Sequence, residues 1–263
     1  MNEYLLLSLC GLALALTVMT LVWWWQTKTK NAGIVDGWWS YIFGMLAVLY
    51  AIIGSGDPLR RATIALLVVI WSVRLGTHLL IRNTAHETED ERYRKLREEY
   101  GNREAFLMWR FFIYQAISNV VLSIPFLLIS VDRSSEYSFL VWAGVVIWFV
   151  ALIGESVADQ QLRKFKMNRS NKGKVCEDGL WNYSRHPNYF FEWLIWVGYA
   201  MIAFDSPYGW ISIICPVLMY ILLNKVTGIP MLESLSVKSK GELYIKYQRT
   251  TSAFFPWFKK SAG

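Results

Sequence analysis

The chain has 263 residues, of which 54% are hydrophobic and 18% are charged, and its formal net charge at pH 7 is +7. Soluble domains usually carry about 25% charged residues. Because the apolar residues also fall in long blocks, this composition excludes a water-soluble globular protein and predicts a polytopic integral membrane protein.

Seven apolar blocks follow one another along the chain, and each reaches or approaches the length of about 20 residues that a helix needs to cross a bilayer. The first block has Glu3 and no basic residue before its apolar run, so we interpret it as a retained helix and not as a secretory signal. The fifth and sixth blocks are short, and we expect each to extend into a polar, partly buried turn at its cytoplasmic end. The predicted fold is therefore all-α with seven transmembrane helices, over residues 4–25, 38–53, 62–81, 111–129, 139–153, 190–204 and 208–223.

Lysine and arginine are distributed unevenly over the loops, and positive charge is retained on the cytoplasmic side of a membrane. With the N-terminus outside, the cytoplasmic segments hold 23 basic residues, whereas the opposite side holds only Arg60, Arg61 and Arg133. Adding or removing one span would scatter these charges over both sides. We therefore predict an outside N-terminus, a cytoplasmic C-terminus and polar loops that face the cytoplasm, as in a bacterial inner-membrane protein.

The chain shows no internal repeat or flexible linker, so we expect a single domain over residues 1–263, whose motif-rich C-terminal half covers residues 139–260. The excess positive charge lies in juxtamembrane loops, where anionic membrane lipid is a simpler partner than nucleic acid. Three widely spaced cysteines and three histidines form neither a disulfide framework nor a metal-ligand spacing, so we expect no metal site. The charged segment 88–106 is helical by propensity and is interpreted as a solvated surface helix or as a ligand-binding arm. We expect a monomer.

Ionisable side chains inside apolar blocks are costly to insert, which makes them candidates for function. Arg74 lies in the third block, and Glu155, Asp159 and Arg163 recur at every fourth position, which places them on one face of the fifth predicted helix. Two structural interpretations remain open: Arg74 could pair with a carboxylate to orient a helix, and Glu155 with Arg163 could form a structural ion pair.

The sixth predicted helix begins with a second group of polar residues. Pro187 is suited to the first turn of a helix, where its missing N–H is not needed. Asn188 and Glu192 have the same four-residue spacing, so this helix start aims both side chains into the bundle. His186 precedes the proline and is expected to cap or to hydrogen-bond rather than to bind a metal.

The run GLWNYSRHPNYFFEWLIWVGY at residues 179–199, preceded by GESVADQQLRKFK at residues 154–166, resembles the C-terminal region of the steroid 5-alpha-reductase family. The resemblance is strongest to its bacterial branch, a membrane protein family of unknown function. It extends to VDGWW near Asp36, WSVRL near Arg74 and EDERYR from Glu89. The segment from Glu233 to Pro256 also fits the wider superfamily, which includes sterol reductases and isoprenylcysteine methyltransferases.

The resemblance implies a seven-helix enzyme that uses NADPH to reduce the carbon–carbon double bond of an enone in a steroid-like or other hydrophobic lipid. The dinucleotide would lie in a polar cavity at the cytoplasmic side, where cationic side chains bind its diphosphate and carboxylates or amides bind its ribose hydroxyls. Lys164 and Arg103 are further candidates for the diphosphate. The implied cofactor-binding residues are Arg74, Glu155, Asp159, Arg163, Arg185, His186, Asn188, Tyr189, Glu192, Glu233 and Tyr247.

The chain departs from the animal enzymes where the substrate carbonyl would bind. Trp71 stands at the position of their tyrosine, and the first apolar block has no glutamine before Gln26. Hydride transfer to an enone requires an acid at the carbonyl oxygen. The candidates for this acid are Asp36, Tyr41 and His78.

Phe191 also replaces a glycine of the family's PNxxGE motif, which predicts a narrower pocket. Two alternative functions remain. The first is a membrane S-adenosylmethionine-dependent methyltransferase of the isoprenylcysteine type, because RHPNY and the segment 233–256 occur there as well. The second is a non-catalytic lipid-binding membrane protein, which the missing tyrosine favours.

Overall fold

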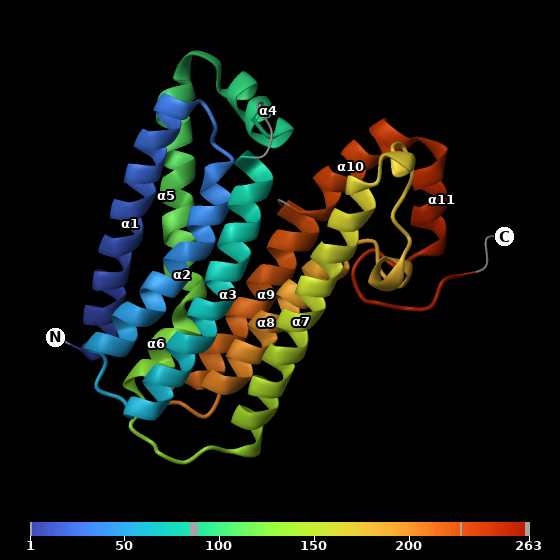
Figure 1. The fold of residues 1–263 in the computed structure, drawn as a ribbon. Coiled ribbons are helices and arrows are strands. Elements are labelled where there is room, and N and C mark those ends of the chain that lie inside the picture. The colour runs from blue at the N-terminus through green and yellow to red at the C-terminus, as the bar shows by residue number, and fades with distance from the viewer. Residues whose placement is uncertain (1, 85–88, 227, 261–263) are drawn as a thin grey trace. The chain divides into compact units, whose positions relative to one another are not determined.

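The structure is a computed structural model that describes residues 2–84, 89–226 and 228–260 (Figure 1). Over these residues the chain is helical and contains no strand, and one isolated backbone bridge joins Ser184 to Ser252. The chain divides into two compact units, Met1–Glu136 with Ser206–Gly209 and Tyr137–Asp205 with Trp210–Gly263. The sequence predicts one domain.

The first unit is a helical bundle in which α2 packs along α3, and α1 packs along α5 and α2. The side chain of Asn2 caps α1 by accepting a hydrogen bond from the Tyr4 amide at 3.1 Å. Asp57 caps α3 in the same way, through the Leu59 and Arg60 amides at 3.0 and 2.9 Å. The elements of this unit are α1 (Glu3–Thr29), α2 (Ile34–Ile53), α3 (Pro58–Thr84), α4 (Glu91–Tyr100), η1 (Gly101–Arg103), α5 (Glu104–Leu122) and α6 (Ile124–Val131).

The second unit is built around α7 and α8, which pack closely along each other. A Cβ atom on Gly144 of α7 would lie 2.9 Å from the carbonyl oxygen of Gly198 on α8, so the two backbones cross where neither residue has a side chain. The elements of this unit are α7 (Phe139–Met167), η2 (Arg169–Asn171), η3 (Gly179–Asn182), α8 (Pro187–Ala203), η4 (Gly209–Ile213), α9 (Ile214–Ile221), the π-helical η5 (Leu222–Val226), α10 (Ile229–Lys240) and α11 (Glu242–Thr250).

Within the described residues, six helical segments are long and apolar enough to cross a membrane, so the chain is an integral multi-pass membrane protein. The sixth segment expected from the sequence, residues 190–204, corresponds to α8, which has only 17 residues and is shorter than each of these six segments. The six segments are Glu3–Thr29, Ile34–Ile53, Pro58–Thr84, Glu91–Leu122, Phe139–Met167 and Gly209–Lys240.

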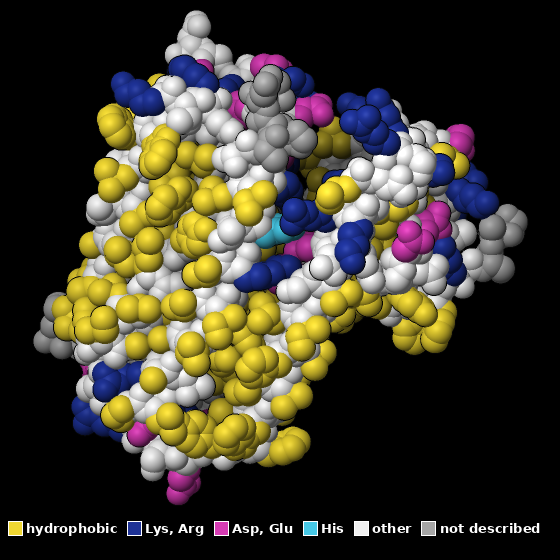
Figure 2. Space-filling model, in the orientation of Figure 1, with side chains coloured by type: hydrophobic (Ala, Val, Ile, Leu, Met, Phe, Trp, Pro, Cys, Tyr) yellow, Lys and Arg dark blue, Asp and Glu magenta, His cyan; other side chains and the backbone are white. Residues whose placement is uncertain are grey.

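Hydrophobic side chains cover much of the helix surfaces of each unit (Figure 2). In the first unit, Arg60 lies in the first turn of α3 and Arg82 in the last. Arg60 is buried and forms an ion pair with Asp132 at 2.8 Å. Arg60 and Arg82, which the sequence assigns to opposite membrane sides, therefore lie at opposite ends of this helix.

Candidate functional site

Helix α7 has two contrasting faces. Its exposed face is apolar and carries Trp142, Val146, Phe149 and Ile153 at helical spacing, as expected of a surface that contacts lipid. The opposite face is packed inside the unit and carries two carboxylates, Glu155 at 2% exposure and Asp159 at 9%.

Arg163 follows these acids one turn later on the same helix and is exposed. A charged side chain is rarely buried without a specific partner. The predicted face of α7 is therefore polar, and its burial increases from Arg163 through Asp159 to Glu155.

The start of α8 brings two more predicted residues to this face. The Asn188 side-chain amide donates a hydrogen bond to Asp159 at 3.2 Å. Glu192, one turn further along, is buried and accepts a hydrogen bond from the Trp196 indole at 3.0 Å. Tyr199 is fully buried on the same helix, and its ring lies 5.8 Å from that of Trp196.

Glu155 and Asp159 are buried on α7, Glu192 is buried on α8, and the hydrogen bond from Asn188 to Asp159 links these two packed helices. We call Glu155, Asp159, Asn188 and Glu192 the α7–α8 cluster. Its members lie within the second unit, and the helical spacing identified in the sequence explains how α7 and α8 present them. Trp196 and Tyr199 support the cluster but were not among the predicted site residues. The sequence does show the four-residue spacing from Glu192 to Trp196. In a helix that is rich in aromatic residues, however, this spacing cannot be told from ordinary core packing.

A second predicted group lies where α8 begins and makes a different kind of contact. Arg185 forms an ion pair with Glu233 of α10 at 2.6 Å, and the His186 ring lies 3.3 Å from the same carboxylate oxygen. The Gln248 side-chain amide donates to the other oxygen of Glu233 at 2.9 Å. Arg185 also donates to the backbone carbonyl oxygens of Gln248 and Thr251 at the end of α11.

Tyr247 completes this group, because its hydroxyl donates to the carbonyl oxygens of Trp181 and Ser184. Burial raises the pKa of Tyr247 and lowers the pKa of His186, and for His186 this effect outweighs the opposing influence of Glu233. This group connects the start of α8 to α10 and α11. We call it the α8–α10 clamp, and it consists of Arg185, His186, Glu233 and Tyr247.

Tyr189 lies beside the clamp, where its ring stacks on His186 with centroids 5.8 Å apart. Gly228 packs close to it, since a Cβ atom there would lie 2.9 Å from the Tyr189 ring and 2.3 Å from the Leu223 carbonyl oxygen. The absence of a side chain at Gly228 is therefore required for the turn between η5 and α10.

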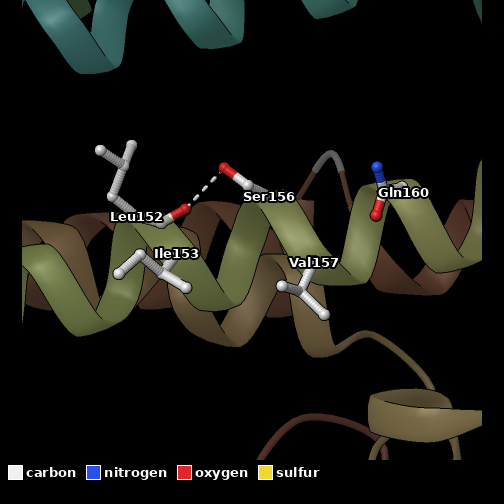
Figure 3. A pocket seen from close by; sticks show the side chains of 5 residues that line it. All are labelled: Leu152, Ile153, Ser156, Val157 and Gln160. Atoms are coloured by element: carbon white, nitrogen blue, oxygen red, sulfur yellow. Dashed lines mark hydrogen bonds between the residues drawn. The ribbon is translucent and has the colours of Figure 1, made fainter.

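A shallow pocket of about 260 Å³ lies on α7 over the same two turns that carry the buried acids (Figure 3). Leu152, Ser156 and Gln160 point to one side of the helix, and Ile153 and Val157 point to another. The Ser156 hydroxyl donates to the Leu152 carbonyl oxygen at 2.7 Å. Ser156 and Gln160 were not predicted, although polar residues four apart in an apolar helix are a signal that could have identified them.

Phe191 of α8 lies at the packed interface with α7. Its ring packs against α7 at Gly154, where an added Cβ atom would lie 2.5 Å from the ring. The residue that replaces the motif's glycine is thus accommodated by a glycine on the neighbouring helix. That Phe191 narrows the pocket stays a prediction.

In the first unit, Asp36 is the centre of a polar network. It accepts hydrogen bonds from Arg92 at 2.9 Å, from the Tyr93 hydroxyl at 2.5 Å and from the Asn83 amide at 3.2 Å. Arg82 approaches the same carboxylate at 3.7 Å. Two motifs that the sequence analysis noted separately, around Asp36 and around residues 89–94, therefore meet.

The segment 88–106 forms α4, η1 and the start of α5, and its residue 88 lies outside the described residues. Arg97 of α4 forms an ion pair with Glu89 at 2.9 Å and donates to Gln26 of α1 at 2.6 Å. The Glu89 carboxylate also accepts from the Ala32 amide at 2.6 Å. These contacts hold the charged arm against the bundle, and they give Gln26 a partner within the protein.

The remaining predicted residues of the first unit lie on α2 and α3. The Tyr41 hydroxyl hydrogen-bonds Thr77 at 2.8 Å. Trp71 is fully buried, with its ring 5.6 Å from Phe43, so it fills the core of this unit. Arg74 and His78 are partly exposed and share one face of α3 because they are four residues apart.

Across the described residues, no group of three or more His, Cys, Asp or Glu side chains is placed to hold a metal ion. The three cysteines are free, and Cys176 and Cys215 are buried.

Fold and site together define an all-helical, multi-pass membrane protein with buried carboxylates on two packed helices. The chain belongs to the family described as "Protein of unknown function (DUF1295)", whose model matches residues 22–251. This family is related to membrane proteins of the steroid 5-alpha-reductase and methyltransferase type.

Two curated relatives illustrate its range. Uncharacterized protein C594.04c of Schizosaccharomyces pombe is 24% identical over 276 residues, which cover 94% of this chain and 78% of that protein. A probable O-methyltransferase of Ustilaginoidea virens, ustE, is 39% identical over 67 residues, which cover 25% of this chain and 23% of that protein. No solved structure matches the chain at a significant level.

Proposed function

We propose that this protein is an NADPH-dependent reductase of the carbon–carbon double bond of an enone in a steroid-like or other lipid. The observation that carries the proposal is the α7–α8 cluster, in which Glu155, Asp159 and Glu192 are buried beside Asn188. Carboxylates at such positions are expensive and are retained where they serve function.

The chemical character of α7 fits a dinucleotide. Arg163 is exposed and forms no ion pair with the residues that the structure describes, so its guanidinium is available to a phosphate. Asp159 and Glu155 follow at spacings of about 6 Å along the helix, and their oxygens are suitable acceptors for ribose hydroxyls and for a carboxamide.

Arg185 is less suited to bind phosphate, because Glu233 and two backbone carbonyl groups already accept its hydrogen bonds. In our proposal the α8–α10 clamp positions the start of α8, and with it Asn188. Arg185, His186, Glu233 and Tyr247 would then affect cofactor affinity indirectly.

When bound, the cofactor would supply a hydride to the β-carbon of the enone. Negative charge then develops on the carbonyl oxygen, and a proton must reach the α-carbon to complete the reduction. We propose Tyr41 or His78 as the acid at that oxygen. Asp36 is assigned a positioning role instead, because Arg92, Tyr93 and Asn83 all donate to its carboxylate.

The shallow pocket along residues 152–160 is our candidate for contact with the apolar substrate. It lies on the turns of α7 that carry Glu155 and Asp159 and offers Ser156 and Gln160 as polar groups within an apolar lining. A dry environment favours hydride transfer, because water would compete for the developing charge.

A second candidate function is methyl transfer from S-adenosylmethionine. The similarity of a 67-residue segment to a probable O-methyltransferase favours it. A carboxylate can bind the ribose of either cofactor, so the α7–α8 cluster by itself does not distinguish the two.

We also propose that α8 crosses the membrane, which would bring the number of spans to seven. The N-terminus would lie outside, and the chain would act as a monomer. The placement of α8 is supported by its length of 17 residues, the lower end of the range of about 17 to 25. The placement of the N-terminus is supported by the asymmetry of the basic residues.

Ligand-dependent thermal stability tests the proposal. Full-length protein purified in detergent is heated with NADPH, NADH, S-adenosylmethionine or no ligand. A ligand at one hundred times its dissociation constant stabilises by about 2.7 kcal/mol, so we expect NADPH to raise the unfolding temperature measurably. A shift with S-adenosylmethionine alone would assign the protein to methyl transfer, and no shift with either would reject both enzymes.

A substitution then tests the site. Glu192→Gln removes a buried charge but keeps the size of the side chain, and we expect NADPH affinity to fall about tenfold or more, because hydrogen bonds to charged groups contribute about 1.5–3 kcal/mol. Glu98→Gln, on the exposed face of α4, is the matched control and should leave affinity unchanged. Unchanged NADPH affinity in the Glu192 variant would remove this residue from the site.

A further inference from the structure

The C-terminal segment 251–260 forms an irregular strap that is fixed to the second unit. The Arg185 amide donates to the Ser252 carbonyl oxygen at 2.8 Å, and the Trp257 amide donates to the Tyr183 carbonyl oxygen at 2.9 Å. The Ser184 hydroxyl donates to the Phe254 carbonyl oxygen at 2.9 Å. The strap therefore has a defined conformation without being helical.

Aromatic packing attaches the first half of this strap to α8 and α9. Phe254 is buried, and its ring lies 5.9 Å from Trp193 and 5.3 Å from Tyr220. Phe255 stacks on Tyr220 at 6.2 Å. Since Tyr220 belongs to a helical segment that is apolar enough to span a membrane, the strap lies against a membrane helix.

The second half of the strap carries two large aromatic side chains that are exposed. Trp257 is 70% exposed and Phe258 is 76% exposed, although their backbone is held in place. Exposure of these rings to water is unfavourable, because burial of their apolar surface would lower the free energy. Aromatic rings in such positions are favoured at the boundary between lipid tails and headgroups.

A cationic pocket of about 560 Å³ adjoins these rings, because Lys259 and Lys260 directly follow Phe258 and line it. Lys174 and Lys246 line it as well. Glu177 is the acidic residue among the lining side chains, and it pairs with Lys259. The pocket therefore carries an excess of positive charge, and its exposed lysines can reach a ligand from several sides.

We propose that this pocket binds the phosphate of an anionic glycerophospholipid headgroup, while Trp257 and Phe258 lie at the level of the adjoining acyl-chain boundary. The two features complement each other, since the lysines match a phosphate and the rings match the interface. Basic residues near a membrane surface attract the headgroups of anionic lipid. None of the α7–α8 cluster lines this pocket, and Tyr247 is the member of the α8–α10 clamp that does.

Native mass spectrometry of the detergent-purified full-length chain tests the site. We compare binding of phosphatidylglycerol with that of phosphatidylcholine, with inorganic phosphate as a competitor. The pocket variant Lys174→Gln/Lys246→Gln/Lys260→Gln should bind phosphatidylglycerol at least tenfold more weakly than the natural chain. The control variant Lys172→Gln/Lys238→Gln/Arg249→Gln removes the same charge from exposed residues outside the pocket and should keep the natural affinity.

A further variant, Trp257→Ala/Phe258→Ala, separates the aromatic part of the site. It should weaken phosphatidylglycerol binding while leaving the weak binding of inorganic phosphate unchanged. The NADPH-dependent thermal shift serves as the folding control, and the pocket variant should retain whatever shift the natural chain shows.

Three outcomes would overturn the inference. Equal binding of phosphatidylcholine would show that the pocket does not recognise negative charge. An equal loss in the control variant would show that only net charge matters. The third outcome combines two results: inorganic phosphate displaces the lipid at a similar concentration, and the aromatic substitutions do not change lipid binding. This outcome would assign the pocket to free phosphate.

Discussion

Single residues in this protein take their roles from partners that are distant in sequence. His186 is adjacent to Arg185 in the chain, but Glu233, 47 residues away, is the group that faces both of them. The carboxylate lies between two nitrogen donors, and the guanidinium is the donor that is always charged. The imidazole can therefore remain neutral, and its burial favours this form.

This arrangement predicts a pH dependence. Burial lowers the pKa of His186 below 6.5 in the folded protein, so the unfolded chain binds a proton more readily. Stability should therefore decrease as the pH falls below about 6.5 and should continue to fall until the folded-state pKa is reached. Thermal unfolding in detergent between pH 8 and pH 5 measures this slope.

His186→Gln should flatten the slope in this pH range, since it removes the titrating group and retains an amide that can face Glu233. His78→Gln controls for the other described histidine. An unchanged slope in the His186 variant would mean that other groups control the acid response.

At the level of elements, α7 and α8 form the framework of the candidate site. Small residues allow them to approach, as at Gly144 with Gly198 and at Gly154 with Phe191. Because this contact is close, the register of Asp159 against Asn188 is coupled to the packing of side chains several turns away. The position of the buried polar groups then depends on helix packing and not on loop structure.

The pair Gly154 and Phe191 tests this coupling. Gly154→Leu places a side chain where the Phe191 ring lies, and such overpacking typically costs about 1–3 kcal/mol. We expect a lower unfolding temperature, and we expect Phe191→Gly to restore much of it when the two changes are combined. Val150→Leu, on the exposed face of α7, is the control. Additive losses in the double variant would contradict direct packing between the two positions.

At the scale of the whole molecule, the distribution of basic residues predicts the orientation of the chain in the membrane. Arg60, Arg61 and Arg133 lie near one end of the first unit, where Arg133 donates to Ser55 and Arg61 donates to the Gly54 carbonyl oxygen. The other basic loops belong to the segments that the sequence assigns to the cytoplasm. The orientation follows from this distribution if the positive-inside rule applies.

Cysteine accessibility in intact cells measures the orientation. Cys10, Cys176 and Cys215 are first replaced by serine, and a single cysteine is then introduced by Arg133→Cys or by Lys172→Cys. A membrane-impermeant thiol reagent should label the first variant directly and the second only after permeabilisation. Labelling of both on the same side would require an even number of spans between them, and reversed labelling would place the N-terminus inside.

The sequence by itself determined the class of protein and the polar faces of its helices. Apolar block length sets the capacity of a helix to span a bilayer, and a four-residue spacing places Glu155 with Asp159, and Asn188 with Glu192, on common faces. Both are local properties, so they can be read without knowing which helices are neighbours.

Only the tertiary structure decided which of these polar groups meet and which are already engaged. Asn188 reaches Asp159 across two helices, whereas Arg185 is held by Glu233, and Asp36 is held by Arg92 and Tyr93. These partners are separated by 29 to 57 residues in the chain. Such pairings depend on how helices pack, and packing depends on the shapes of many side chains at once, as the contact of Phe191 with Gly154 shows.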